Sequence, residues 1–291
     1  MKLQHRIILR TAKSIEAVNL AAHYKLKEDN RETTPFKLVF FTGASGLNYL
    51  NSSLISIYKF WKKIPEICIV SDGTPKDVLN KGLIKWPKIV DIFSWEECAL
   101  SFKEKGNTHL YNYATNVLIG KKLTGLLYCA EKFPILYSDT DVLWLNSPSE
   151  IEFDTNRKPQ IKMSNDIGFF YTKELLENLN EQNCFNTTPY NSGVMFLNGD
   201  FSVYPKWKAL SEYLGTHHNM GWFSEQTTFA ILNNFFNPNN FFKRDEVLIN
   251  VDDAYSLKYT KKKYPNVLAR HYVNVKGTTF WRDFTYMFFK K

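Results

Sequence analysis

Two carboxylates, Asp139 and Asp141, interrupt an apolar run that extends from residue 135 to residue 145. In an extended strand, side chains two residues apart project to the same side, so both carboxylates would face one site. Burying an unpaired carboxylate is costly, and a divalent cation offsets that cost because hard ions bind carboxylates together with substrate phosphate oxygens. The pair therefore predicts a metal site, with a helix cap or a simple turn as the alternative for the pair taken alone.

Other blocks carry side chains suited to sugars or phosphates, and each has a plainer structural alternative. Asn-Ser-Gly is common in a turn that enters a strand, an isolated His before Tyr is commonly a core or surface residue, and Ser-Asp-Gly-Thr is typical of a β-turn. These blocks are Ser71–Thr74, Lys121-Lys122, Tyr190–Asn198, Ser224-Glu225-Gln226 and Arg270-His271-Tyr272.

Four blocks in order resemble the retaining GT-A glycosyltransferases related to glycogenin and the family 8 galactosyltransferases, over roughly residues 36–283. They are Asp139-Thr140-Asp141, Tyr190–Asn198, Ser224-Glu225-Gln226 with Asn233, and Arg270-His271-Tyr272. Segments 136–148 and 271–281 also resemble the broader nucleotide-diphospho-sugar transferase group. The resemblance implies an α/β, Rossmann-like GT-A domain with a central mixed, mostly parallel sheet flanked by helices. It also implies a retaining hexosyltransferase that moves a sugar from a nucleotide-diphosphate donor, a UDP-sugar by resemblance, to an acceptor hydroxyl.

The resemblance assigns the metal as well. Asp139 and Asp141 would hold Mn²⁺ or Mg²⁺ against the donor diphosphate, with His271 as a third protein ligand. Imidazole favours manganese, and the ion would act as a Lewis acid that neutralises charge on the leaving nucleoside diphosphate. Because no nucleophile for a double displacement is identified, we expect front-side attack by the acceptor hydroxyl.

Four side chains carried over from the resemblance would act at the reacting sugar. Lys122 would contact the donor phosphates or the sugar, although Lys121 competes for this role. Gln226 would lie near the anomeric centre, Glu225 would accept a sugar hydroxyl where the relatives have Asp, and Asn191 would hydrogen-bond the donor sugar. Further donor contacts are expected from Thr42, Gly43, Ala44, Asp72, Thr140, Ser192 and Lys276, the last within a segment that departs from the Gly and Lys-Pro-Trp pattern of the relatives.

Strands that alternate with helices must position these residues. Apolar runs predict strands at 36–41, 67–70, 89–93, 135–138, 167–171 and 194–197, and helical spacing predicts helices at 47–61, 110–131, 203–214 and 224–233. This alternation favours an open α/β sheet whose ligands bind at the carboxyl ends of its strands. With no Pro/Gly-rich linker, we expect one catalytic domain, 35–291, after an N-terminal helical extension, 1–34.

Composition narrows the function further. The 291 residues are 44% hydrophobic, 23% charged and 16% aromatic, which disfavours disordered, collagen-like and coiled-coil proteins. The net charge of +8 suits an anionic partner such as a nucleotide, but the lysines are scattered, so nucleic acid is not expected. Four widely spaced cysteines predict reduced, structural thiols. Without an apolar stretch of about 18 residues or a signal peptide, we expect a cytoplasmic protein.

Three alternatives stay open at this stage. The Asp-Thr-Asp block also resembles the nucleophile motif of haloacid-dehalogenase-like phosphatases, although Leu143 stands where that motif has Thr. A catalytically inactive sugar-nucleotide or glycan-binding module would keep the fold without activity. The aromatic and basic end, 284–291, suits either docking on the domain or peripheral contact with the inner face of a membrane. The donor sugar, the oligomeric state and the acceptor, whether glycan, lipid-linked or protein, cannot be read from the sequence.

Overall fold

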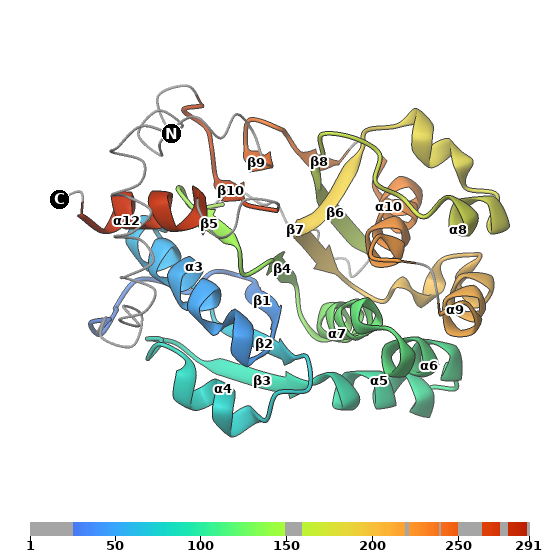
Figure 1. Cartoon of the computed structure of the whole chain (residues 1–291), viewed down its shortest axis with the longest axis horizontal. Coiled ribbons are helices and arrows are strands. Elements are labelled where there is room, and N and C mark those ends of the chain that lie inside the picture. Colours follow the sequence, from blue (N-terminus) through green and yellow to red (C-terminus); the bar gives the residue numbers. More distant parts are fainter. Residues whose placement is uncertain are drawn as a thin grey trace.

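The computed structural model describes residues 26–148, 159–218, 221–238, 240–249, 264–273 and 279–289. A mixed sheet forms its centre (Figure 1). Its strands follow the order β3-β2-β1-β4-β7-β6-β8, and only β7 runs antiparallel to its neighbours. Their bounds are β1 (Lys37–Thr42), β2 (Ile67–Ser71), β3 (Val90–Ser94), β4 (Ile135–Ser138), β6 (Gln160–Asn165), β7 (Tyr190–Asn198) and β8 (Phe241–Phe242).

Alternating side chains give the sheet two buried faces and two hydrophobic cores. In β1, Leu38 and Phe40 belong to one core and Val39 to the other, as the period of two requires. The first core is covered by α3 (Leu47–Phe60), α4 (Lys76–Gly82) and α12 (Trp281–Phe289). The second is covered by α5 (Trp95–Glu104), α6 (Thr108–Asn116), α7 (Leu118–Lys132), α8 (Lys173–Asn178), α9 (Trp207–Thr216) and α10 (Ser224–Phe236).

A second, smaller sheet lies beside α3 and α12 (Figure 1). It has the order β5-β10-β9, formed by β5 (Val142–Trp144), β10 (Ala269–His271) and β9 (Val247–Ile249). Strand β10 pairs antiparallel with β5, so that His271 stands opposite Val142. Because of this pairing, His271, which is near the end of the chain, lies next to the segment that follows β4.

Most predicted elements in the described residues are confirmed, two differ, and some elements were not predicted, α5 among them. The helix expected over 110–131 is two helices, α6 and α7, because Val117 between them is extended, with φ −130° and ψ 123°. The sequence reasoning missed α5, although Ser94 and Glu97 form the capping box that its Ser-x-x-Glu pattern encodes. The strand expected at 167–171 is a loop, and the strand at that point is β6, which ends at Asn165.

The described part of the predicted N-terminal extension, 26–34, lies against the domain. Arg31 donates hydrogen bonds to the carbonyls of Trp61 (2.6 Å) and Tyr58 (2.9 Å) at the end of α3. Thr33 forms a parallel bridge with Ile64. The helix expected in this extension, over 11–27, lies outside the described residues as far as residue 25.

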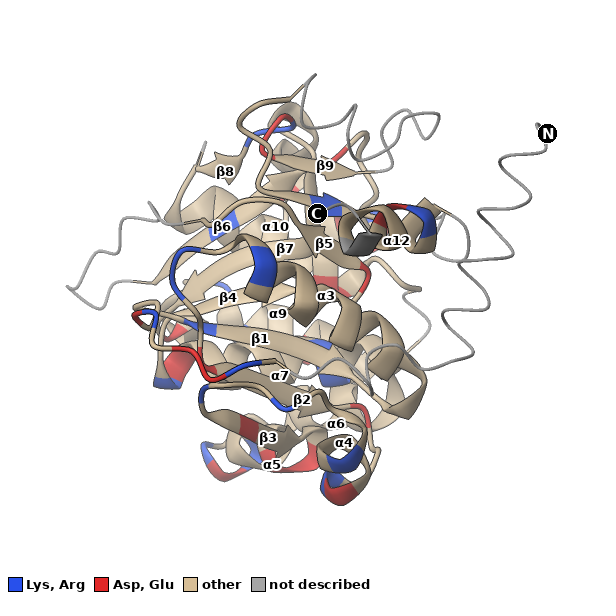
Figure 2. Ribbon diagram, turned by 90° about the vertical axis from the view of Figure 1, so that its left-hand side faces the viewer, with Lys and Arg blue, Asp and Glu red and all other residues tan. Residues whose placement is uncertain are grey.

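The aromatic end of the chain was expected either to dock on the domain or to contact a membrane, and most of it forms helix α12. Trp281, Phe284 and Met287 are buried in the first core, so these side chains dock on the domain rather than facing a membrane. Lys and Arg are spread over many elements in Figure 2, with acidic residues among them. Among the described residues, no helix combines the length and the hydrophobicity needed to cross a bilayer. The four cysteines are free and buried, as expected.

Candidate functional site

The predicted site residues meet at the edge of the sheet where β4 ends. Asp139 and Asp141 lie in a turn between β4 and β5, not in one extended strand, so their convergence does not come from the period of two that the sequence suggested. The turn is held on both sides. The Asp139 N–H donates to the Gly193 carbonyl (2.7 Å), and the Tyr272 N–H donates to the Asp141 carbonyl (3.0 Å).

Asp139, Asp141 and His271 form a cluster whose ligand atoms all lie within 4.8 Å of one another. His271 Nε2 is 3.4 Å from Asp139 Oδ2 and 3.5 Å from Asp141 Oδ1. Neighbouring donors in an octahedral shell with bonds of about 2.1 Å are about 3 Å apart, so only a small adjustment brings these atoms onto one ion. Two carboxylates and an imidazole suit Mn²⁺, which accepts both oxygen and nitrogen ligands.

His271 is oriented for this role by its other ring nitrogen. Nδ1 lies 3.2 Å from Asn191 Oδ1, which can only accept, so Nδ1 carries the proton and Nε2 faces the carboxylates. Such partners of a ligating imidazole fix its tautomer and its direction. Asn191, predicted to contact the donor sugar, therefore also holds His271, a candidate metal ligand, in place.

Gly193 gives the imidazole its room. A Cβ atom at Gly193 would stand 2.1 Å from His271 Cε1 and 2.4 Å from Nδ1, far inside van der Waals contact. The sequence suggested that this glycine lets the backbone approach a ligand. In the structure, the group that approaches it is His271.

The two residues that flank His271 in the chain are both bound by one buried carboxylate, that of Asp283. Because strand side chains alternate, Arg270 and Tyr272 point away from His271, and both donate to Asp283 Oδ2 of α12, at 3.0 and 2.9 Å. Arg270 and Asp283 are 1% and 0% exposed. The C-terminal helix thus fixes the strand that presents the metal ligand.

Lys122 is the lysine that reaches the site. Its Nζ lies 3.3 Å from Asp139 Oδ1 and 3.4 Å from Glu225 Oε1, and it stands over the ring of Tyr137. The Tyr137 hydroxyl donates to Asp139, a partner that the sequence reasoning missed, although Tyr137 and Asp139 are two residues apart at the end of β4. Lys121 instead donates to the Asp72 carbonyl (3.0 Å) and packs on Trp95.

The start of β7 and the start of α10 are joined through Ser192. Its hydroxyl donates to Glu225 Oε2 (2.8 Å), and its N–H donates to Gln226 Oε1 (3.2 Å). Beside them, Asn191 Nδ2 donates to Asp166 Oδ2 (3.0 Å). Asp166 follows β6, whose parallel direction delivers it to the same edge. The sequence reasoning missed it because the apolar residues after it were assigned to a strand.

The electrostatics of the cluster follow from these contacts. Burial alone would lower the pKa of His271, but the Asp141 and Asp139 carboxylates outweigh it and raise that pKa to about 9. Burial alone would raise the pKa of Asp139, yet Lys122, His271 and the Tyr137 hydroxyl hold it below its usual value. Burial raises the pKa of Glu225. Without a cation, His271 therefore keeps a proton that a metal ion must displace.

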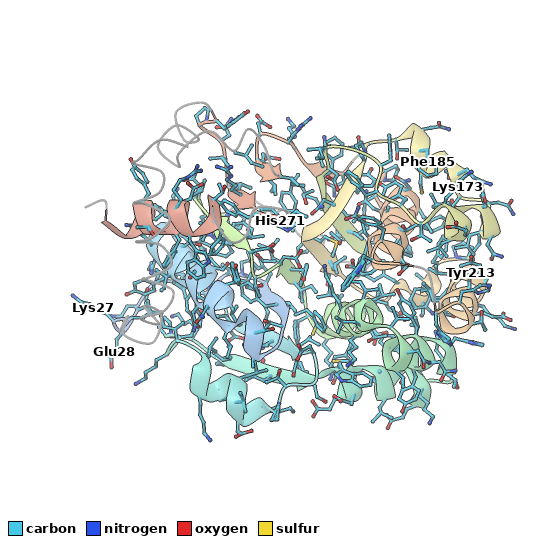
Figure 3. The ribbon with its side chains drawn as sticks, viewed as in Figure 1. Lys27, Glu28, Lys173, Phe185, Tyr213 and His271 are labelled. Atoms are coloured by element: carbon cyan, nitrogen blue, oxygen red, sulfur yellow. The ribbon has the colours of Figure 1, made fainter. Side chains whose placement is uncertain are left out.

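These residues line a pocket of about 310 Å³, which we call the central pocket. His271 lies where the two sheets meet (Figure 3). The polar part of the lining, which we call the floor, comprises Lys122, Asp139, Asp141, Asp166, Asn191, Ser192, Glu225, Gln226 and His271. Apolar side chains of Ile119, Ile167, Phe170, Trp222, Phe223, Ile249 and Val273 complete it, together with Gly193.

The residues expected to touch the nucleotide lie at the same sheet edge but do not line the central pocket. Thr42, Gly43 and Ala44 follow β1, and Asp72 follows β2. The Asp72 carboxylate accepts from the N–H (3.0 Å) and hydroxyl (2.9 Å) of Thr74, so the β-turn alternative is present in the structure. A Cβ at Gly43 would lie 2.0 Å from Asp72 Oδ2. Thr140 lies on the β1 side, near Gly46, and Lys276 lies outside the described residues.

No protein-family model and no curated protein sequence matches this chain. Solved structures of glycosyltransferases do. The galactosyltransferase LgtC, in complex with donor and acceptor sugar analogs, is 13% identical over 86% of this chain and 94% of its own, with a TM-score of 0.51. Mouse xyloside xylosyltransferase 1 is 16% identical over 82% and 98%, with a TM-score of 0.51.

The bifunctional glycosyltransferase WbbM has a TM-score of 0.53 at 13% identity, over 89% of this chain and 50% of its own. At these identities the likeness concerns the fold. The chain therefore has the GT-A glycosyltransferase fold that the sequence blocks implied.

Proposed function

We propose that this protein is a metal-dependent glycosyltransferase of the retaining, family 8 type, which transfers a hexose from a nucleotide-diphosphate donor, a UDP-sugar by resemblance, to an acceptor hydroxyl. The observation that carries the proposal is the Asp139-Asp141-His271 cluster on the floor of a pocket at the end of β4. Ligands of open α/β sheets bind at this edge, and the solved structures with a similar fold are glycosyltransferases.

The floor residues would have separate roles in binding the metal, the phosphates and the sugar. When bound, a divalent cation supplies Lewis-acid stabilisation of the donor diphosphate, and Asp139, Asp141 and His271 would hold it. Lys122, whose burial would lower its pKa but whose carboxylate neighbours Asp139 and Glu225 raise it, stays charged and adds positive charge beside the leaving phosphate. The remaining donor contacts are assigned to Thr42, Gly43, Ala44, Asp72, Thr140, Asn191, Ser192, Glu225, Gln226 and Lys276.

In the transfer step, the acceptor hydroxyl oxygen forms a bond to the anomeric carbon on the face that the diphosphate leaves. The bond between that carbon and the β-phosphate oxygen breaks, and its electron pair leaves with the nucleoside diphosphate. A phosphate oxygen of the leaving group takes the hydroxyl proton, so no protein base is needed. Because the acceptor oxygen attacks the anomeric carbon directly, no protein nucleophile is needed either. Gln226, held by Ser192, would contact the reacting sugar from the protein side.

A donor-binding and hydrolysis panel tests this function. UDP- and GDP-sugars are mixed with the protein with and without Mn²⁺, and the melting temperature and released sugar are measured. One donor at about 100 times its Kd should add about 2.7 kcal/mol of stability, which corresponds to a rise of about 5–10 °C in Tm. Asp141→Ala should abolish both the shift and the hydrolysis, whereas the matched variant Asp77→Ala, at an exposed position on α4, should keep both.

The anomeric configuration of the product, measured by NMR, tests retention separately. Binding of no nucleotide sugar with any metal would show the donor assignment to be wrong. Release of phosphate from monoesters, abolished by Asp139→Asn, would then favour the phosphatase alternative. Tight Mn²⁺-dependent donor binding with neither hydrolysis nor transfer would favour the inactive binding module.

A further inference from the structure

A second cavity, of about 600 Å³, lies at the end of the small sheet that is remote from the central pocket, and we call it the distal pocket. Asn146, just after β5, lines it, as do Glu246 and Leu268, which immediately precede β9 and β10. At their other ends, β9 and β10 finish at Ile249 and His271, which line the central pocket. Because a strand rises about 3.3 Å per residue, these three-residue strands hold the two cavities about 10 Å apart. The distal pocket is therefore separate from the proposed donor site.

Three lysines from three separate segments line the distal pocket. Lys62 follows α3, Lys162 belongs to β6 and Lys243 follows β8. Within the described ranges of the chain, none of these three ammonium groups has a carboxylate partner. By contrast, Lys63, which does not line the pocket, is paired with Glu32 at 2.6 Å. Lysines that surround a cavity without a counter-charge of their own favour an anionic ligand.

Two carboxylates line the same cavity and narrow the choice of anion. The Glu246 carboxylate is engaged, because Oε2 accepts from the Lys243 N–H (2.7 Å). In the part of the chain that the structure describes, the Asp245 carboxylate has no such donor. Asn146 donates from Nδ2 to the Val267 carbonyl (2.6 Å), which leaves its Oδ1 as an acceptor. A ligand that suits both the lysines and these acceptors combines an anionic group with hydroxyl donors.

The cations of the distal pocket suit phosphate better than a carboxylate. Its lining contains no arginine, the side chain whose planar fork matches a carboxylate, whereas lysines bind phosphate as point charges. Phe60 and Phe242 contribute apolar surface to the lining, and the Lys162 ammonium lies 4.5 Å from the centroid of the Phe242 ring. Aromatic side chains of this kind can pack against the C–H groups of a sugar. A cavity of this volume accommodates a small molecule rather than a surface.

We propose that the distal pocket is a binding site for a phosphorylated saccharide. Lys62, Lys162 and Lys243 would hold the phosphate group, and Asp245 and Asn146 would accept hydrogen bonds from the sugar hydroxyls. A free hexose phosphate and a phosphorylated unit of a longer glycan share this chemistry. The inference goes beyond the proposed function and does not rest on it, because none of these residues belongs to the floor of the central pocket.

Calorimetric titrations in EDTA, which keeps divalent ions out of the central pocket, test the site. The probes are mannose 6-phosphate, pentamannose 6-phosphate, unmodified mannose, glucuronate and inorganic phosphate. Each is titrated into wild type, Lys162→Gln, Lys243→Gln and the matched control Lys63→Gln. Lys243 is exposed on a loop, so its substitution keeps the test open if loss of the contact between Lys162 and Phe242 disturbs folding. Lys122→Gln reports anion binding in the central pocket.

Mannose 6-phosphate should bind wild type at least about tenfold more tightly than mannose, glucuronate or inorganic phosphate. Lys162→Gln and Lys243→Gln should each weaken that binding about tenfold, because each removes a charge-assisted contact, whereas Lys63→Gln should bind as wild type does. Tighter binding of pentamannose 6-phosphate would identify a glycan as the source, and equal binding a free sugar phosphate.

Three results would overturn the site. One is wild-type affinity for mannose 6-phosphate in both Lys162→Gln and Lys243→Gln. Another is loss of binding in Lys122→Gln alone, which would place the anion in the central pocket. The third is binding of glucuronate or inorganic phosphate as tight as that of mannose 6-phosphate, which would contradict recognition of a phosphorylated sugar. None of these results bears on Mn²⁺-dependent donor hydrolysis, so the proposed function stands or fails separately.

Discussion

Asp141 and His271 on the floor of the central pocket are 2% and 4% exposed. The exposed rings of Phe170, Trp222 and Phe223 line the same pocket and form what we call its aromatic rim; Trp222 and Phe223 are 70% and 46% exposed. Floor side chains are fixed by hydrogen bonds and ion pairs from five separate elements, β4, β7, β10, α7 and α10. Rim side chains are anchored mainly through their backbone, and their rings face solvent. A buried polar network tolerates little change because each lost partner leaves another group unsatisfied, whereas an exposed ring contributes through its area alone. Substitutions in the floor should therefore affect all donor chemistry, and substitutions in the rim should leave the floor and its metal binding almost unchanged.

Gly193→Ala breaks the floor without removing any polar group. The added Cβ would overlap the His271 ring, so the imidazole must turn away from the two carboxylates. Disturbing the support of a metal ligand typically lowers metal affinity 10- to 100-fold, and we expect the upper end, about 100-fold, because a ligand itself moves. Titration with Mn²⁺, followed by its electron paramagnetic resonance signal, measures the loss. Wild-type affinity in this variant would contradict the ligand role of His271.

Asp283→Asn tests whether the floor depends on the C-terminal helix. The substitution breaks the buried pair with Arg270, which should cost about 3–5 kcal/mol of unfolding free energy. Because Arg270 and Tyr272 flank His271, we also expect about a tenfold loss in Mn²⁺ affinity in the protein that remains folded. Denaturant unfolding and Mn²⁺ titration below the transition separate the two effects. Reduced stability with unchanged affinity would limit Asp283 to a structural role.

Metal binding by the floor should depend on pH through His271. With a pKa of about 9 in the metal-free protein, the imidazole is protonated at neutral pH, and each bound ion must release that proton. The apparent Kd for Mn²⁺ should rise about tenfold for each unit that the pH falls between 8 and 6, and should level off above about pH 9. Calorimetry in buffers of different ionisation enthalpy counts the protons, and release of none would contradict this linkage.

The stability of the metal-free protein should respond to pH in the opposite sense. The pKa of His271 is raised above its unfolded value of about 6.5, so its contribution is fully present below that pH and is lost as the pH rises through about 9. Other groups titrate as well, so the comparison is with His271→Gln, which lacks this contribution. Urea unfolding of both proteins between pH 6 and pH 9.5 should show the difference between them shrinking.

Phe223→Leu should have the smallest effect of these substitutions, and it tests whether the rim and the floor can be changed independently. Leucine keeps much of the apolar area but loses the stacking with Phe170, which is worth about 0.5–1.5 kcal/mol. The free energy of unfolding should fall by about this amount, while Mn²⁺ affinity remains that of the wild type. Urea unfolding, together with Mn²⁺ titration, checks both expectations. A change in metal affinity would show that rim and floor are not separable.

Apolar runs alone led to most of the sheet. The runs at 36–41, 67–70 and 135–138 correspond to β1, β2 and β4. A short run that is apolar at successive positions is typical of a strand with both faces buried, as these strands are. The order of strands and helices then placed Asp139 at the ligand-binding edge. The run at 167–171 misled the same reasoning, because an exposed aromatic loop and a buried strand have similar local composition.

The sequence predicted only part of the candidate site. The resemblance carried by the sequence blocks predicted that a carboxylate pair, an amide block and a histidine belong to one site, and the structure brings these side chains together. Only the tertiary structure decided which of two adjacent lysines reaches the site. Lys121 and Lys122 differ by about 100° around α7, so they face different neighbours, and which of them reaches the site depends on how the helix docks on the sheet. The roles of Gly193, Asp166 and Asp283 depend on contacts between distant segments, and local periodicity carries no information about such pairings.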